Sequence, residues 1–120
     1  METEGNGMQF NETYDLVIKD RKTQTTRPLK FLEYYDKKEY YPGGKLILVE
    51  PPNPTLPANH HIRLTQRPIR TTLGVVASQK EHWQREGFSS GDESRAAWIK
   101  LHGKFDADQE VCVLRFIRVD

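Results

Sequence analysis

Residues 18–27 read IKDRKTQTTR, and they carry the strongest structural signal in the chain. Thr is β-branched, so the three threonines of this segment favour an extended strand, which Pro28 ends or places at a sheet edge. Four apolar residues between positions 10 and 18 recur at helical spacing and predict a helix with one buried face just before the strand. Asn11 suits the N-cap of that helix, which should end near Asp20.

Further elements follow from apolar runs and from capping and turn residues. The sequence predicts strands at residues 45–50, 62–65, 69–78 and 110–119, with Gly74 as a bulge in the third. A helix should start at Ser90, which forms a capping box with Glu93, and end near Gly103. We expect residues 29–41 to be irregular or partly helical, residues 80–87 to form a helical turn, and residues 51–59, with four prolines, to form a surface loop.

Strands outnumber helices in this order, and their connections are short. The sequence therefore predicts an α+β, mainly β fold: a small barrel or curled sheet of five or six strands with two or three flanking helices. A length of 120 residues suits one domain, here residues 9–120 after a disordered tail at residues 1–8.

Charge and hydropathy narrow the classes of partner. Lys and Arg number 18 against 17 Asp and Glu, and the net charge of +1 argues against a basic coat that binds nucleic acid non-specifically. The apolar runs are too short to span a bilayer, and the N-terminus lacks the apolar core of a signal peptide. We therefore expect a cytoplasmic protein without a membrane partner, and a monomer is favoured.

Cysteine and histidine usage gives no sign of a metal or cofactor. Cys112 is the single cysteine, so an internal disulfide is excluded, and its apolar surroundings predict a buried, unreactive thiol. The four histidines, at positions 60, 61, 82 and 102, show no metal-binding spacing with one another or with Cys112.

Three segments together resemble the ASCH family, a branch of the PUA-like fold. Residues 18–27 are similar to the signature Gly-x-Lys-Thr-x-Thr-x-Arg, with Asp20 in place of its glycine. Residues 41–49 resemble the turn and strand that follow it, and residues 86–90, Trp98 and the strand at 111–119 resemble the rest. Asp tolerates a left-handed turn better than most residues, so the backbone can survive the change at position 20. The resemblance covers most of residues 14–119 and implies a PUA-like barrel.

Some ASCH proteins are amidohydrolases that remove the acetyl group from N4-acetylcytidine. Mapped onto this chain, the resemblance implies Lys22, Thr25 and Glu86 as the catalytic residues. Thr25 would supply a nucleophile or an oxyanion donor, Lys22 a base if burial and nearby arginines lower its pKa, and Glu86 an acid or an orienting group. Without the resemblance, these residues would be a solvated lysine, a strand former and a helix charge.

The ligand would be a nucleoside or an RNA base, and Arg21, Arg27 and Trp83 are the candidates to bind it, by charge and by stacking. Other family members are thought of as RNA-binding modules or ribonucleases, so both alternatives stay open. RNA binding would use Arg21, Lys22, Arg27 and Arg70 on phosphates, and a ribonuclease would draw on His60, His61 and His82.

The geometry of the strand restricts where Lys22 can lie. Lys22 and Thr25 point to opposite faces of a regular strand, so Lys22 must lie in the turn before it.

Overall fold

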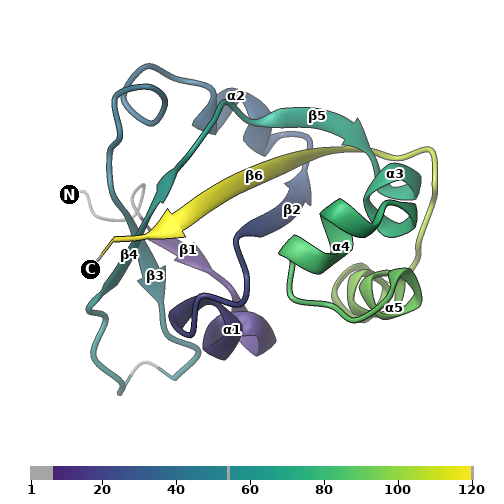
Figure 1. The fold of residues 1–120 in the computed structure, drawn as a ribbon, viewed down its shortest axis with the longest axis horizontal. Coiled ribbons are helices and arrows are strands. Elements are labelled where there is room, and N and C mark those ends of the chain that lie inside the picture. The colour runs from purple at the N-terminus through teal and green to yellow at the C-terminus, as the bar shows by residue number, and fades with distance from the viewer. Residues whose placement is uncertain (1–6, 54, 120) are drawn as a thin grey trace.

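A computed structural model describes residues 7–53 and 55–119 (Figure 1). The strands are β1 (Gly7–Gln9), β2 (Gln24–Pro28), β3 (Ile47–Glu50), β4 (His60–Leu64), β5 (Ile69–Thr72) and β6 (Glu110–Arg118). The helices are the 3-10 turn η2 (Asn11–Thr13) and the α-helices α1 (Tyr14–Ile18), α2 (Phe31–Tyr35), α3 (Leu73–Ser78), α4 (Lys80–Arg85) and α5 (Gly91–His102). The predicted mixture of helices and a dominant sheet is confirmed.

The six strands form one curled sheet, which makes a half-barrel. Its order is β1-β3-β4-β6-β2, and β5 pairs with β6 outside this path. β1 runs parallel to β3, whereas the pairs β3–β4, β4–β6, β2–β6 and β5–β6 are antiparallel. β2 lies along one side of β6, and β5 and β4 follow one another along the other side. β2 is therefore an edge strand: one of its edges pairs with β6, and the other has no strand partner among the described residues.

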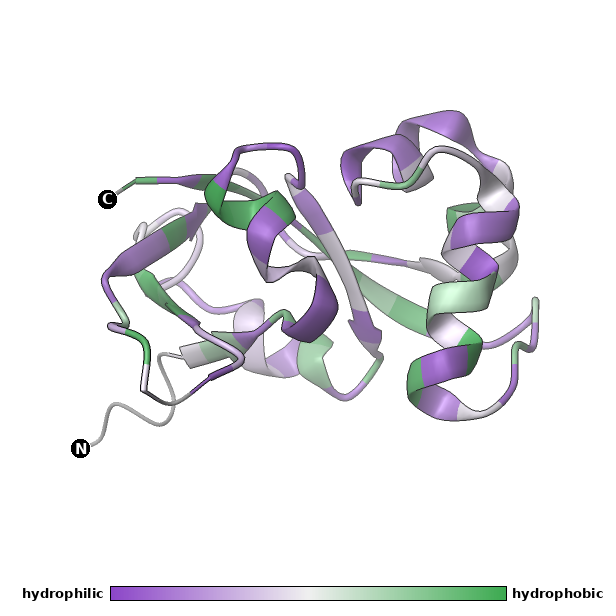
Figure 2. Cartoon of the chain, turned by 90° about the horizontal axis from the view of Figure 1, so that it is seen from below, coloured by the Kyte–Doolittle hydropathy of each residue, from purple (hydrophilic) through white to green (hydrophobic). Residues whose placement is uncertain are grey.

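The long strand β6 separates two apolar cores. Cys112, Leu114 and Phe116 join the core inside the half-barrel, while Val111 and Val113 pack with Leu73, Val76 and Trp98 under the helices. Successive side chains of a strand point to opposite faces, so one strand can serve both cores. Figure 2, seen from below, shows the group of α3, α4 and α5 at one end of the molecule, with the curled sheet extending from it toward the other end. The predicted burial of Cys112 is confirmed, and burial raises the pKa of its thiol to about 12.

Helix α5 begins and ends as the sequence predicts. The Ser90 side chain accepts a hydrogen bond from the backbone N–H of Glu93, and the Glu93 carboxylate accepts one from the backbone N–H of Ser89. Gly103 follows the helix in a left-handed conformation, with φ 89°. Both ends of α5 are thus capped by local residues.

The prediction of one strand over residues 69–78 is wrong in its second half. The strand stops at Thr72, whose hydroxyl accepts a hydrogen bond from the backbone N–H of Val75 and so caps α3. Gly74 lies in the first turn of α3 rather than in a bulge, and its N–H donates to the carbonyl of Ala107. The β-branched valines of this segment favour a strand, and packing against the segment before β6 overrides that preference.

The number of flanking helices is also larger than predicted. Residues 7–53 and 55–119 contain five α-helices rather than two or three: α3 replaces half a strand, and α2 lies in the segment expected to be irregular or partly helical. Asn11 is the first residue of η2 and makes no N-cap hydrogen bond for α1, whose N-cap position is Thr13.

The chain ends and the proline loop complete the fold. Gly7 and Met8, at the end of the segment for which the sequence predicts disorder, form β1 with Gln9, and residues 1–6 lie outside the described residues. The proline loop joins β3 to β4, as expected, and its described residues contain no helix or strand before His60. Across the described residues, no helix has the length and apolar character needed to cross a membrane.

Candidate functional site

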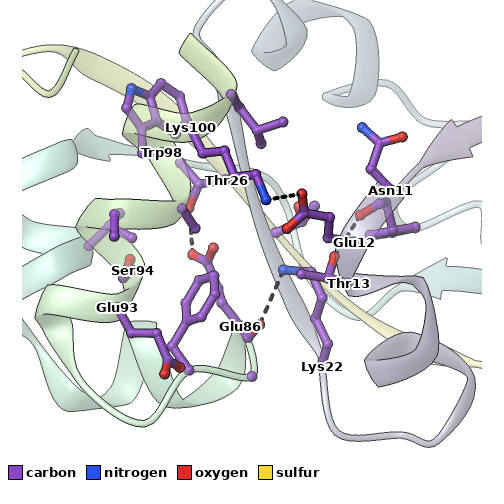
Figure 3. A pocket seen from close by; sticks show the side chains of 18 of the residues that line it. Asn11, Glu12, Thr13, Lys22, Thr26, Glu86, Glu93, Ser94, Trp98 and Lys100 are labelled. Atoms are coloured by element: carbon purple, nitrogen blue, oxygen red, sulfur yellow. Dashed lines mark hydrogen bonds and ion pairs between the residues drawn. The ribbon is translucent and has the colours of Figure 1, made fainter. Parts of the chain in front are cut away.

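A cavity of about 470 Å³ lies beside β2, between α1 with η2 on one side and α3 with α5 on the other (Figure 3). Its wall is mostly apolar and includes Phe10, Leu16, Phe88, Trp98, Leu101 and Phe105. Among the polar lining residues are Lys22, Thr25, Thr26, Arg27 and Glu86. A volume of this size and an apolar wall with a few polar groups are typical of small-molecule sites.

The turn between α1 and β2 places Lys22 at this cavity. Asp20 adopts the left-handed conformation, with φ 60°, which supports the expectation that Asp can replace a glycine at this position. The backbone N–H groups of Arg21 and Lys22 both donate to the carbonyl of Leu16, which closes the end of α1. Lys22 therefore lies before the first residue of β2 and is free of the strand's alternation, as the sequence required.

Lys22 is a buried amine with one polar contact. Its side chain is 4% exposed, and Nζ donates to the backbone carbonyl of Glu86 at 3.2 Å. The same Nζ lies 5.7 Å from the centre of the Phe88 ring. Burial lowers the pKa of Lys22 to about 8, the Glu86 carboxylate opposes the shift, and the Arg27 guanidinium adds to it. A lysine with this pKa can take up a proton near neutral pH.

A close approach between the end of α4 and the turn before β2 brings Glu86 to Lys22. The backbone N–H of Thr23 donates to the carbonyl of Arg85 at 2.7 Å. Gly87 has φ 92°, and a Cβ there would lie 2.8 Å from Cδ1 of Leu16. Glycine thus permits both the left-handed backbone and the narrow gap at this junction.

The Glu86 carboxylate is held from β2. It is 5% exposed, and its Oε2 accepts hydrogen bonds from Gln24 Nε2 at 2.8 Å and from Thr26 Oγ1 at 2.5 Å. Gln24 and Thr26 lie two residues apart and face the same side of the strand, so both reach one carboxylate oxygen. Figure 3 shows the contacts of Glu86 with Lys22 and Thr26 across the cavity.

Thr25 reaches the cavity from the other face of β2. It pairs with Leu114, which faces the core of the half-barrel, whereas Thr26 pairs with Val113, which faces the helices. Both threonines line the cavity because β2 ends the sheet and the cavity extends around its free edge. Thr25 is 5% exposed, and within the part of the chain that the structure describes its hydroxyl has no hydrogen-bond partner.

The structure separates the three predicted binding residues. Arg27 lines the cavity, where its guanidinium donates to the carbonyl of Gln9 at 2.6 Å and lies 5.3 Å from the centre of the Phe10 ring. Arg21 is exposed and Trp83 is half-buried, and neither lines the cavity. A Cβ on Gly91 would lie 3.7 Å from the Trp83 ring, which places that ring against the start of α5.

An ion pair joins the two sides of the cavity at its rim. Lys100 of α5 lies 2.5 Å from the Glu12 carboxylate of η2, and both side chains are largely exposed (Figure 3). With this pair, the charged lining residues of the described chain are three bases, Lys22, Arg27 and Lys100, and three acids, Glu12, Glu86 and Glu93. The charges around the cavity therefore balance.

Sequence reasoning missed several residues of the site. Gln24 and Thr26 lie inside the quoted segment, but the strand pattern alone does not show that Glu86 approaches from α4. Phe88 lines the cavity where Trp83 was expected, and the aromatic character of both gave no signal to choose between them. Trp98, one of the residues that carry the ASCH resemblance, packs in the core under the helices and also forms part of the cavity wall. Among residues 7–53 and 55–119, no cluster of three or more His, Cys, Asp or Glu could hold a metal ion.

Comparisons with known proteins inform the fold. No family model and no curated protein matches the chain. Among solved structures, the chain is similar to the crystal structure of protein EF3133 from Enterococcus faecalis V583, which carries the family-model name DUF984. The match has a TM-score of 0.60 and 19% sequence identity, and it covers 92% of this chain and 68% of that chain. This likeness shows a shared fold, and the ASCH resemblance stays a prediction.

Proposed function

We propose that the protein is an amide hydrolase of the ASCH type that removes the acyl group from N4-acetylcytidine or a related acylated pyrimidine nucleoside. One observation carries the proposal. Lys22, Thr25 and Glu86, which the resemblance implies as a catalytic set, lie at most 5% exposed on the wall of one cavity, and the pKa of Lys22 is about 8. A buried amine with a lowered pKa, next to other buried polar groups on one cavity wall, is typical of active sites.

The arrangement supports two forms of the hydrolysis. In the first, Thr25 Oγ1 attacks the amide carbonyl while neutral Lys22 takes its proton. The C–N bond then breaks, the leaving amine gains the proton from Lys22, directly or relayed through the Glu86 carboxylate, and water hydrolyses the acyl ester to carboxylic acid and free Thr25. In the second, Lys22 or Glu86 activates water, which attacks directly, and the Thr25 hydroxyl donates to the oxyanion. Both forms release cytidine and acetate from N4-acetylcytidine.

The balance of charge around the cavity supports an uncharged ligand over an RNA chain. Three bases and three acids face the cavity, whereas sites that bind polyphosphate backbones concentrate positive charge. The ribonuclease alternative gains no support either, because none of His60, His61 and His82 belongs to the cavity wall of the described chain.

The test is turnover of N4-acetylcytidine by purified protein, followed as release of cytidine and acetate. We expect the wild-type protein to turn over and Lys22→Met, which removes the amine but keeps the length of the side chain, to lose at least about 100-fold in kcat/KM. Lys19→Met is the matched control, because Lys19 is exposed, outside the cavity and three positions away.

Two outcomes would count against the proposal, and the Lys19→Met control tells them apart. An equal loss in Lys19→Met and Lys22→Met would show that the loss does not come from the buried amine. No turnover by the wild-type protein, across several N4-acylated pyrimidines, would overturn the proposed function.

A further inference from the structure

Gln24 is the most deeply buried polar side chain of the site. It is 0% exposed, and both ends of its amide have partners. Its Oε1 accepts a hydrogen bond from Arg115 Nε at 2.9 Å, and its Nε2 lies 2.8 Å from Glu86 Oε2 and 3.1 Å from His82 Nδ1. Burial of an amide costs several kcal/mol unless its hydrogen bonds are made, so this network has to be satisfied as a whole.

Arg115 determines which way the Gln24 amide points. A guanidinium only donates hydrogen bonds, so the amide oxygen must face Arg115. The amide nitrogen then faces Glu86 and His82 with its two hydrogens, and the two nearest acceptors are Glu86 Oε2 and His82 Nδ1. Arg115 itself is held on the far side by Glu81, 3.6 Å from its guanidinium.

The same logic assigns the state of His82. The Gln24 amide nitrogen lies 3.1 Å from His82 Nδ1 and 3.5 Å from the His82 backbone carbonyl, so the closer contact is a hydrogen bond when the imidazole is neutral with its proton on Nε2. Burial, with the nearby Arg115, also lowers the pKa of His82, while Glu86 and Glu81 oppose the shift and Arg85 adds to it. His82 therefore receives one Gln24 hydrogen and leaves the other for Glu86.

The two donors act on one oxygen of Glu86. Gln24 and Thr26 both donate to Oε2, and among the described residues Oε1 has no hydrogen-bond partner. Glu86 lines the cavity, so the carboxylate is clamped through Oε2 and keeps Oε1 for a ligand. Charge-assisted hydrogen bonds of this kind fix both the position and the rotation of a carboxylate.

We propose that Gln24 is a positioning residue: oriented by Arg115, it clamps Glu86 Oε2 together with Thr26 and so presents Oε1 to the amide being hydrolysed. This inference rests on the proposed function, and it extends the site to residues that do not touch the substrate. The clamp acts on the chemical step, so its loss lowers kcat and leaves the affinity for substrate largely unchanged.

The first test compares variants of the two donors. Gln24→Glu keeps the acceptor for Arg115 but places an oxygen against Glu86, and Thr26→Val removes the second donor without changing the shape. We expect each to lower kcat about 10- to 100-fold, as for one hydrogen bond to a charged group, with KM within about twofold of wild type. Thr26→Ser keeps the hydroxyl and should restore kcat to within about threefold.

Glu81→Gln is the matched control, because it removes the carboxylate beyond Arg115 and leaves the contacts of Gln24 intact. Circular dichroism and thermal unfolding establish that each variant is folded. If Gln24→Glu were unable to fold, the Thr26→Val and Thr26→Ser pair would carry the kinetic test. Folded variants at both positions with undiminished kcat would overturn the positioning role while leaving the hydrolase itself standing.

A second test does not depend on activity. In the wild-type protein, ¹⁵N NMR of His82 should show a neutral ring with the proton on Nε2 and Nδ1 as acceptor. A proton on Nδ1 at neutral pH would contradict the donor pattern of Gln24 and overturn the proposal. Absence of wild-type turnover would instead overturn the proposed function, and the positioning role would fall with it.

Discussion

At the scale of single residues, the burial of Lys22 lowers the free energy of unfolding. A pKa lowered from 10.5 to about 8 means that the folded protein disfavours the charged amine by about 3 kcal/mol. The unfolded chain binds the proton more tightly, so this cost is fully present below pH 8 and is relieved as the pH rises toward 10.5. A solvated lysine at the same position would avoid the cost, which favours a functional reason for its burial.

The pKa of Lys22 predicts the pH dependence of turnover. If neutral Lys22 is the base, only about a tenth of the protein is active at pH 7, and kcat/KM should rise about tenfold per pH unit before levelling near pH 8. A pH series with N4-acetylcytidine, corrected for spontaneous hydrolysis, measures this directly. A profile that falls through pH 8 would show that the protonated amine is the active form, and Lys22 would then be an electrostatic donor.

At the scale of elements, the site depends on how closely α4 approaches the turn before β2. The backbone carbonyls of Arg85 and Glu86 accept hydrogen bonds from the Thr23 N–H and from Lys22 Nζ, and Gly87 permits the close approach. Gly87 and Gly103 have nearly the same left-handed φ, 92° and 89°, but no atom lies within 4 Å of a Cβ built on Gly103. A comparison of the two glycines therefore separates the effect of the left-handed backbone from the effect of the close contact with Leu16.

Alanine substitutions at the two glycines should have similar effects on stability and different effects on turnover. Both Gly87→Ala and Gly103→Ala should lose about 1–2 kcal/mol in free energy of unfolding, because alanine disfavours the left-handed conformation. Only Gly87→Ala should also lose turnover, since its methyl group displaces Leu16, which lines the cavity. Denaturant unfolding and kinetics on both proteins measure the two effects, and equal turnover in the pair would show that the junction tolerates a wider gap.

Elements with local signals could be predicted, and elements set by distant contacts could not. Ser90 and Gly103 mark the ends of α5 through bonds within a few residues, so the sequence alone was sufficient there. The strand at 69–78 failed because Gly74 meets Ala107, more than thirty positions along the chain, and no local pattern records that contact.

The residues of the site also fall into those marked by a local sequence signal and those placed by distant contacts. The segment at 18–27 marked Lys22 and Thr25, and the structure places both on the cavity with Glu86. The roles of Gln24 and Thr26 depend on the register of β2 against β6 and on the position of α4, which only the folded chain provides. Phe88 lines the cavity, whereas Trp83 lies against the start of α5, and no local pattern records either placement.

At the scale of the whole molecule, two apolar cores share β6, and the cavity lies where the half-barrel meets the group of α3, α4 and α5. The rim is bridged by Glu12 and Lys100, an exposed pair of the kind that contributes at most about 1 kcal/mol. The half-barrel supplies β2 and the α1 turn, and the helices supply Glu86 and most of the apolar wall. Neither part holds the candidate site alone.

The charge balance of the molecule predicts a weak dependence on salt. With a net charge of +1 and equal numbers of acids and bases around the cavity, the KM for a neutral nucleoside should change less than about twofold between about 20 and about 200 mM NaCl. Steady-state kinetics at both concentrations checks this. RNA affinity that falls steeply over the same range, without turnover, would favour the binding-module alternative instead.

The proline loop between β3 and β4 offers a practical handle on the molecule. None of its described residues, 51–53 and 55–59, belongs to the cavity wall, so this described part of the loop does not line the cavity. Loop closure becomes only slightly less favourable as a surface connection grows longer. A fluorophore, an affinity peptide or a surface anchor introduced there would report on the protein or immobilise it while the cavity beside β2 remains open.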